Sequence, residues 1–249
     1  MSIKVYVPYT LNFGDLLNAF PVISGFYHSF GEKIKLVVPD QMEQIKGWRE
    51  FFNFQPMIES SHLRKEIIGM EEDQYIQVIY SPEEYRNLLS RPNRPIETLR
   101  HEKFVRDYYP NLGKWEVDDD FYLEVDGQLE SYDKFVCGDR WLNKNTDTRR
   151  ASNVLMDSGL FNDENKFLFL DYSQTAMHNA ALIKFSTKPF IGTFTGSSVM
   201  ADLMNKEHYV LWNKQDMLFW NNAPILYSYW KHYYSDRESQ LVEIGEFSL

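Results

Sequence analysis

Two strand–turn–helix units, one near each end of the chain, limit the folds that this sequence can adopt. In the first, residues 3–8 alternate apolar and polar side chains, pass through a turn at 10–15 into a helical pattern, and reach an apolar strand pattern at 34–39. In the second, residues 189–192 pass through small residues at 195–198 into a helical pattern and another apolar run. Strands that alternate with helices in this way are typical of parallel sheets covered by helices.

The sequence therefore predicts an α/β fold of two Rossmann-like domains, whose parallel sheets face each other across a cleft. Residues 116–133 carry eight acidic side chains and neither Lys nor Arg, which indicates a domain boundary or an exposed crossover. We predict an N-terminal domain at 1–130 and a C-terminal domain at 131–249. Further elements are expected as strands at 75–80, 134–138 and 166–171, and as helices at 42–52, 83–89, 96–108, 150–161 and 176–185.

Charge and cysteine content exclude several classes of protein. The formal net charge of −10 argues against a general nucleic-acid coat or a binder of anionic membranes. Cys137 is the single cysteine, so an intrachain disulfide cannot form, and we expect it to be a small core residue at a strand end. No apolar stretch reaches the roughly 18–20 residues that span a bilayer, and the N-terminus does not resemble a signal peptide. We expect a cytoplasmic protein, and the sequence does not indicate its oligomeric state.

Two segments resemble a known family. Residues 12–21, Asn-Phe-Gly-Asp-Leu-Leu-Asn-Ala-Phe-Pro, are similar to the opening of family 9 glycosyltransferases, the heptosyltransferase-like group. Those chains begin with a strand, a loop that ends in Gly-Asp, and a helix with an early Pro. Residues 190–212 are similar to the donor-site unit of the same family. This chain departs from the family at Phe194 and Val199, where an Asp and a His are usual.

The resemblance implies the GT-B architecture, in which an active site lies between two Rossmann-like domains. It implies transfer of a sugar from a nucleotide-sugar, a co-substrate, so that no cofactor is expected. Asp15 matches the family's catalytic acidic residue and is our candidate for the base that takes the proton of the acceptor hydroxyl. The structural alternative is that Asp15 caps the following helix.

The second turn is the predicted binding site for the diphosphate of the donor. Thr195, Gly196, Ser197 and Ser198 precede or begin a helix, and free backbone N–H groups at a helix N-terminus bind phosphate. The alternative is an ordinary Ser N-cap. By resemblance, the loop after the first strand of the C-terminal domain supplies a cation to the diphosphate, which indicates Arg140; the alternative is a solvated loop residue.

The acceptor side is predicted from polar and basic residues of the N-terminal half. Asn12 is a candidate, with Thr10 and Asn18, although turn and capping roles explain these residues equally well. Residues 86–106 hold six Lys and Arg side chains against two Glu, and Arg91, Arg94 and Arg100 are our candidates for binding an anionic acceptor. Such an acceptor is a glycan of the lipopolysaccharide core or DNA with a hydroxymethylated base. The alternative is a solvated helix face.

Two rival functions remain open at this point. The departures at Phe194 and Val199 suit a non-catalytic nucleotide- or glycan-binding protein on a decayed transferase scaffold. Asp118 and Asp120 have the Asp-x-Asp spacing of metal-dependent transferases, although an acidic loop explains them better and we predict no metal site. His178 has no second ligand at metal-binding spacing, so we expect a partly buried structural histidine.

Overall fold

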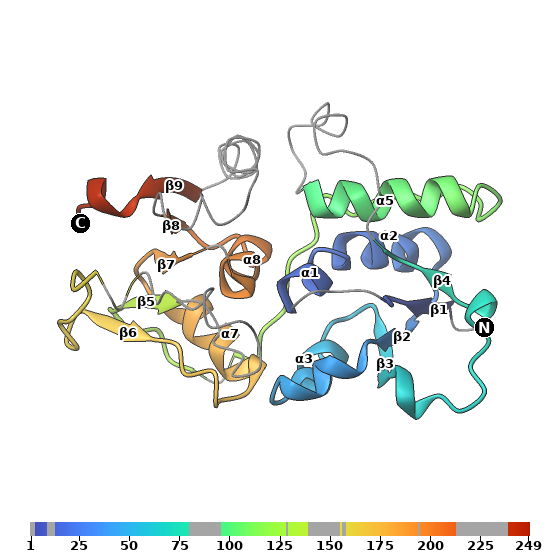
Figure 1. The fold of residues 1–249 in the computed structure, drawn as a ribbon, viewed down its shortest axis with the longest axis horizontal. Helices are drawn as coiled ribbons and strands as arrows, with labels where there is room; N and C mark the ends of the chain where they lie inside the picture. Colours follow the sequence, from blue (N-terminus) through green and yellow to red (C-terminus); the bar gives the residue numbers. More distant parts are fainter. Residues whose placement is uncertain are drawn as a thin grey trace. The chain divides into compact units, whose positions relative to one another are not determined.

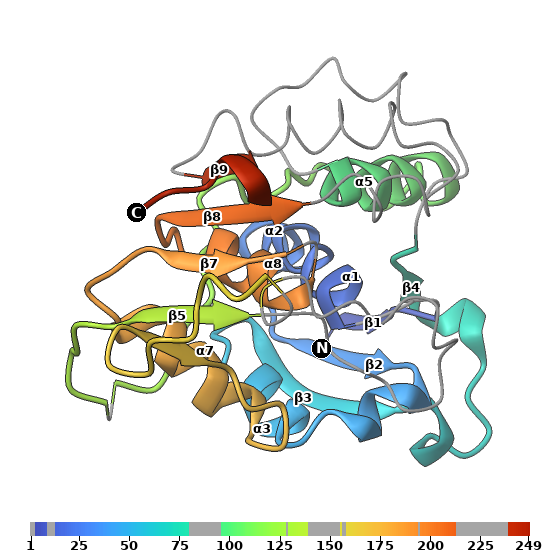
Figure 2. The ribbon, with the colours of Figure 1, turned by 60° about the vertical axis from the view of Figure 1, so that its left-hand side comes forward.

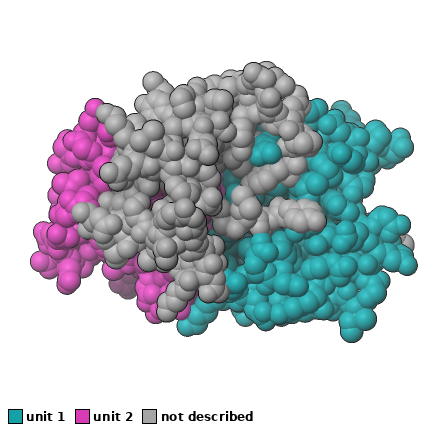
Figure 3. Space-filling view, in the orientation of Figure 1, with its two compact units in different colours: residues 1–125, 175–177 teal, residues 126–174, 178–249 magenta. Residues whose placement is uncertain are grey.

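The computed structural model describes residues 3–8, 13–79, 96–127, 129–138, 155, 158–193, 195–212 and 239–249. The chain divides into two compact units, coloured separately in Figure 3: unit 1 holds residues 1–125 and 175–177, and unit 2 holds residues 126–174 and 178–249. The division therefore falls inside the acidic stretch. Each unit contains one parallel sheet with its helices.

Unit 1 is built on a four-stranded sheet (Figure 1). Its strands are β1 (Ile3–Tyr6), β2 (Ile34–Val38), β3 (Ile58–Leu63) and β4 (Ile76–Gln77). Its α-helices are α1 (Phe13–Leu17), α2 (Phe20–Phe30), α3 (Trp48–Asn53) and α5 (Ile96–Tyr108), and its 3-10 helices are η1 (Asp40–Gln44), η2 (Arg64–Glu66) and η3 (Glu72–Gln74). The strand order is β3-β2-β1-β4, with every pair parallel. The chain adds β2 and β3 on one side of β1 and β4 on the other side, so the direction of winding reverses between β1 and β4.

The sequence pattern explains how α1 and α2 are separated. The periodicity predicts one helix that begins at Asp15, whereas the structure has a turn at Asn18 and Ala19 between two helices. Pro21 then lies in the first turn of α2, where its missing N–H removes no helical hydrogen bond. Gly31 ends α2 in the left-handed conformation with φ 70°, which glycine adopts without steric cost.

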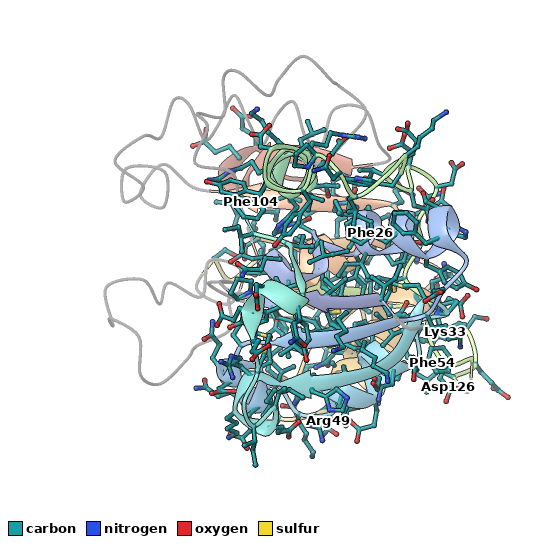
Figure 4. The ribbon with its side chains drawn as sticks, turned by 90° about the vertical axis from the view of Figure 1, so that its right-hand side faces the viewer. Phe26, Lys33, Arg49, Phe54, Phe104 and Asp126 are labelled. Atoms are coloured by element: carbon teal, nitrogen blue, oxygen red, sulfur yellow. The ribbon has the colours of Figure 1, made fainter. Side chains whose placement is uncertain are left out.

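Aromatic side chains fill the core of unit 1. Phe20, Phe26 and Phe52 are fully buried, and the rings of Phe26 (labelled in Figure 4) and Trp115 lie 4.8 Å apart in an edge-to-face arrangement. The helices α2 and α5 run side by side in this unit (Figures 1 and 2). Large buried rings of this kind make the core of unit 1 sensitive to any change in side-chain volume.

The first part of the acidic stretch packs on unit 1. Alternate apolar side chains from Trp115 to Leu123 are buried, while acidic side chains such as Asp119 and Asp120 are exposed. The Gln55 amide pairs with the backbone of Glu124 in both directions, donating to its carbonyl at 3.0 Å and accepting from its N–H at 2.9 Å. The expectation of an exposed crossover is therefore wrong for this part, because alternating burial holds it against the unit.

Unit 2 is built on a five-stranded parallel sheet with the order β6-β5-β7-β8-β9 (Figure 2). Its strands are β5 (Phe135–Gly138), β6 (Phe167–Phe169), β7 (Phe190–Gly192), β8 (His208–Trp212) and β9 (Ser239–Glu243). Its helices are α8 (Gly196–Leu203), η5 (Ile244–Glu246) and most of α7 (Ala176–Phe185). The winding reverses between β5 and β7. Cys137 is a fully buried core residue of β5, as predicted.

Most expected elements are present, and the differences have local causes. The helices α5 and α7 coincide with their predicted ranges, but the helix expected at 42–52 is split into η1 and α3 by Gly47, which has φ 70°. The strands β3 and β9 were not predicted, since β3 contains a polar run at 59–62. The predicted helix at 83–89 and most of the one at 150–161 lie outside the described residues. Within the described ranges, none of the helices combines the length and apolar character that a bilayer crossing requires.

Candidate functional site

The strand orders define one ligand-binding edge in each unit. In open parallel sheets, ligands bind beyond the carboxyl ends of the strands, at the point where the winding reverses. This point lies between β1 and β4 in unit 1 and between β5 and β7 in unit 2. The predicted base Asp15 follows β1, and the predicted diphosphate site follows β7. Asp15 and the turn at 195–198 therefore each follow a strand at the reversal point of their own unit.

In unit 2, two glycines let α8 begin directly against the strand ends. Gly138 and Gly192 are register partners at the carboxyl ends of β5 and β7. A Cβ atom on Gly138 would lie 2.6 Å from Cζ of Phe190 and 3.0 Å from Cβ of Ser197, and one on Gly192 would collide with the Ser198 hydroxyl. The side chains of Ser197 and Ser198, in the first turn of α8, therefore pack directly on these two glycines.

The turn before α8 is held by its own hydrogen bonds. The Thr195 N–H donates to the Thr193 carbonyl at 2.7 Å, and the fully buried Ser198 hydroxyl donates to the same carbonyl at 2.6 Å. Thr195 is the N-cap residue, with an extended backbone and no capping hydrogen bond from its side chain. The alternative of an ordinary Ser N-cap is therefore wrong, and Ser198 stabilises the turn instead.

This turn also leaves polar groups unsatisfied. Over the described ranges, the N–H groups of Gly196 and Ser197 have no hydrogen-bond acceptor, and the buried hydroxyls of Thr193 and Thr195 have no hydrogen-bond partner. Thr193 is only 6% exposed. A buried polar group without a partner lowers folding stability by about 1–3 kcal/mol, so nearly all such groups in proteins have a hydrogen-bond partner in the protein, in water or in a ligand. Because α8 has eight residues and a partial positive charge at this end, an anion is the ligand that suits these groups.

A tyrosine that sequence reasoning missed belongs to the same edge. Tyr172 follows β6, and its hydroxyl lies 2.8 Å from the hydroxyl of Ser197 in the first turn of α8. Asp171 beside it accepts hydrogen bonds from the backbone and hydroxyl of Ser173, at 2.8 and 2.9 Å, which shape the loop. The position of Tyr172 just after a predicted parallel strand was the available signal. The loop after β6 therefore contacts the predicted diphosphate site.

In unit 1, Asp15 lies within the first turn of α1 and is partly exposed. The N-cap alternative for Asp15 is wrong, because α1 already includes Phe13 and Gly14. The imidazole Nε2 of His101, on α5, lies 3.4 Å from the Asp15 carbonyl oxygen. Burial lowers the pKa of His101 to about 4, although the carbonyls of Asp15 and Ile79 act in the opposite direction. The imidazole is therefore neutral at physiological pH.

The described part of the basic stretch is largely neutralised by neighbouring acids. Lys103 pairs with Asp107 at 3.1 Å, and Arg106 pairs with the buried Glu102 at 2.8 Å. Arg100 is half-buried on α5. The other candidates of this group, Arg91 and Arg94, lie outside the described residues, as do Asn12, Thr10 and Arg140. Binding of an anionic acceptor here stays a prediction.

Asp118, the first residue of the Asp-x-Asp pattern, has structural partners. Asp118 accepts a hydrogen bond from the Ser24 hydroxyl at 2.5 Å and lies 3.3 Å from Nε2 of His28. Among the described residues, no group of three or more His, Cys, Asp or Glu side chains could hold a metal ion. His178 is exposed, so the expectation of a partly buried structural histidine is wrong.

Comparisons with known proteins give a likeness of fold. No family model and no curated protein matches the chain. The structure is similar to a family 9 glycosyltransferase from Veillonella parvula DSM 2008, with a TM-score of 0.55 and 9% identity over 98% of this chain and 86% of that one. It also matches the glycosyltransferase TibC of enterotoxigenic E. coli H10407 at a TM-score of 0.48 and 11% identity, over 85% of this chain.

The chain spans 59% of the length of TibC. The Veillonella structure supports a GT-B-like fold for this chain, with two α/β units that each contain a parallel sheet. The resemblance to heptosyltransferase-like family 9 proteins, first indicated by two short segments of sequence, is thus confirmed as a similarity of structure.

Proposed function

We propose that this protein is a glycosyltransferase that moves a sugar from a nucleotide-sugar donor to a hydroxyl acceptor. In this proposal, the edges of the two units face each other across a cleft, as in GT-B enzymes. The donor binds at the start of α8 in unit 2, and Asp15 of unit 1 serves the acceptor. The acceptor class, a phosphate-bearing glycan or hydroxymethylated DNA, is proposed from the basic stretch.

One observation carries the proposal: the unsatisfied polar groups at the start of α8. The two free N–H groups of Gly196 and Ser197 and the hydroxyl of Thr195 offer three donors to a diphosphate. A leaving diphosphate gains negative charge as the glycosidic bond breaks, so donors already in place stabilise the transition state. Arg140, which follows β5 in the sequence, is proposed to add a cation. No metal ion is required, because the helix terminus and the guanidinium supply the positive charge.

Asp15 is the proposed base. Its carboxylate takes the proton of the acceptor hydroxyl while the oxygen attacks the anomeric carbon and the nucleoside diphosphate leaves. General-base catalysis of this kind contributes roughly 10²–10⁴-fold to the rate. Asp15→Asn keeps the size and polarity of the side chain but cannot accept the proton.

The test is to incubate the protein with a panel of nucleotide sugars and acceptors and to measure released nucleoside diphosphate, with and without EDTA. We expect EDTA-resistant transfer by the wild type. Asp15→Asn should lower kcat at least about 100-fold with donor affinity retained, whereas Asp73→Asn, an exposed acid on η3, should change nothing. Retention of the wild-type rate by Asp15→Asn would contradict the assignment. Sensitivity to EDTA would favour a metal-dependent mechanism.

A non-catalytic binding protein is the second candidate, and one observation favours it. Val199, at the position where the family resemblance leads us to expect His, is a buried residue of α8 with 4% exposure, so it offers no polar group to a donor. Such a protein would bind nucleoside diphosphates at the start of α8 without turnover. Calorimetry that detects binding, together with no release from any donor in the panel, would favour this function. Gly196→Val should weaken donor binding in both cases, since a side chain there obstructs the approach of phosphate.

A further inference from the structure

The helix that carries Asp15 is too short to hold itself in place. Helix α1 has five residues, and isolated helices below about 12–15 residues are marginal in water. Two of its end carbonyls are satisfied by the backbone: the Asn18 N–H donates to the Gly14 carbonyl at 3.1 Å, and the Ala19 N–H donates to the Leu16 carbonyl at 3.0 Å. The position of Asp15 therefore depends on which groups donate hydrogen bonds to the remaining backbone carbonyls around it.

Helix α5 supplies side-chain donors to those carbonyls. Thr98 and His101 are three residues apart, so they lie on the same face of α5, and both are buried, at 1% and 0% exposure. The Thr98 hydroxyl donates to the Asn18 carbonyl at 2.8 Å. Nε2 of His101 lies 3.4 Å from the Asp15 carbonyl, and since a carbonyl only accepts, Nε2 must carry the proton in this contact.

His101 also interacts with the chain that follows β4. The backbone carbonyl of Ile79, two residues after the end of β4, acts on the imidazole together with that of Asp15. The strands β1 and β4 flank the reversal point of unit 1, so one buried imidazole interacts with the backbone beyond both strands.

We propose that His101 is a positioning residue, which holds the backbone of Asp15 so that its carboxylate is oriented for proton abstraction. This inference rests on the proposed role of Asp15 as the base. His101 does not touch substrate in this account, and it acts through the backbone of α1. A misplacement of about 1 Å in a catalytic group can cost about 100-fold in rate, so the loss of this contact should reduce turnover rather than donor binding.

The experiment compares His101→Leu with His101→Gln. Leucine removes the donor, whereas the terminal amide of glutamine places an N–H near the position of Nε2. We expect His101→Leu to lower kcat about 10- to 100-fold with an unchanged donor KM, and His101→Gln to restore kcat to within about threefold of the wild type. His62→Gln, on β3 with its ring against the Ser60 hydroxyl, is the matched control and should leave kcat unchanged.

A second measurement does not depend on activity. The amides of Asn18 and Ala19 close α1, so we expect His101→Leu to speed their hydrogen exchange at least about tenfold, with His101→Gln close to the wild type. If the wild type transfers no sugar, the proposed function fails, and the exchange data alone decide whether His101 holds α1. If His101→Leu does not fold, His101→Asn replaces it, because its shorter amide does not reach the Asp15 carbonyl.

Three results would overturn the inference. One is equal kcat values for the leucine and glutamine variants. Another is a loss in kcat/KM that arises from donor KM, since that would indicate damage to donor binding. The third is unchanged exchange at Asn18 and Ala19 in His101→Leu.

Discussion

The two reversal points of this molecule have similar topology and opposite polar chemistry. In unit 1, side chains of α5 donate to the carbonyls that follow β1, with Thr98 on Asn18 and His101 near Asp15. In unit 2, the turn after β7 leaves the hydroxyls of Thr193 and Thr195 without partners over the described residues. The comparison teaches that polar groups at the same kind of sheet edge can be paired within the protein or left unpaired, and our proposal assigns the unpaired groups to a ligand.

The physical basis of the difference is the cost of buried polar groups. Where the protein itself supplies a donor to a backbone carbonyl, as Thr98 does for Asn18, the backbone is held in a defined place, here close to Asp15. Unpaired buried polar groups at an edge lower the stability of the free protein. A ligand that supplies the missing hydrogen-bond partners restores that free energy. This contrast predicts that equivalent substitutions at the two edges will have opposite effects on stability and binding.

The largest expected effect is the pH dependence contributed by His101. Its pKa is about 4 in the folded state and about 6.5 when exposed. The unfolded state therefore binds more protons between these values, so folding stability is full above pH 6.5 and falls by about 3 kcal/mol as the pH approaches 4. A titration of the imidazole by NMR should give a midpoint near 4, and urea unfolding should show that His101→Gln lacks this component. A midpoint near 6.5 would contradict the buried, neutral imidazole on which the account of unit 1 depends.

A substitution at the sheet edge of unit 2 should have the next largest effect. Gly192→Ala places a Cβ against the Ser198 hydroxyl and 2.6 Å from the ring of Phe190, so we expect a loss of about 1–3 kcal/mol in unfolding free energy. Donor affinity should fall with it, because α8 must move. The control is Gly245→Ala, where a Cβ meets open space. Equal stability of the two variants would indicate that α8 does not pack directly on the strand ends.

Thr98→Val tests the satisfied edge of unit 1. The Asn18 carbonyl loses its buried donor while the side-chain volume is retained, so we expect a loss of about 1–2 kcal/mol, measured by urea unfolding. Donor KM should not change, since the donor is proposed to bind unit 2. If the unfolding free energy is unaffected, the Asn18 carbonyl does not depend on a hydrogen-bond donor from α5.

Thr195→Val is the matched change at the open edge and has the smallest expected effect on stability. The Thr195 hydroxyl makes no capping bond and has no hydrogen-bond partner among the described residues, so valine removes an unpaired buried group and the unfolding free energy should rise by about 1 kcal/mol. Binding of a nucleoside diphosphate, followed by calorimetry, should weaken about tenfold, which corresponds to about 1.4 kcal/mol. Unchanged affinity would exclude this hydroxyl from the diphosphate site.

Much of the α/β framework follows from local sequence. The helices α5 and α7 were predicted at their observed bounds because each is a run without Gly or Pro that ends shortly before a proline. The strand β3 was not predicted, because its polar run at 59–62 is compatible with a strand only once β2 pairs with it and Asn53 accepts a hydrogen bond from Ser61. The strand β9 was not predicted either, because it is recognised by its pairing with β8 and not by a local pattern.

The sequence by itself determined the alternation of strands and helices and the presence of small residues after β7, because these depend on neighbouring side chains and backbone propensity. Only the tertiary structure decided which groups at the two edges have partners. Tyr172 lies 25 residues from Ser197, and His101 lies 86 residues from Asp15. Hydrogen bonds over such separations depend on packing between elements, so no local pattern contains them.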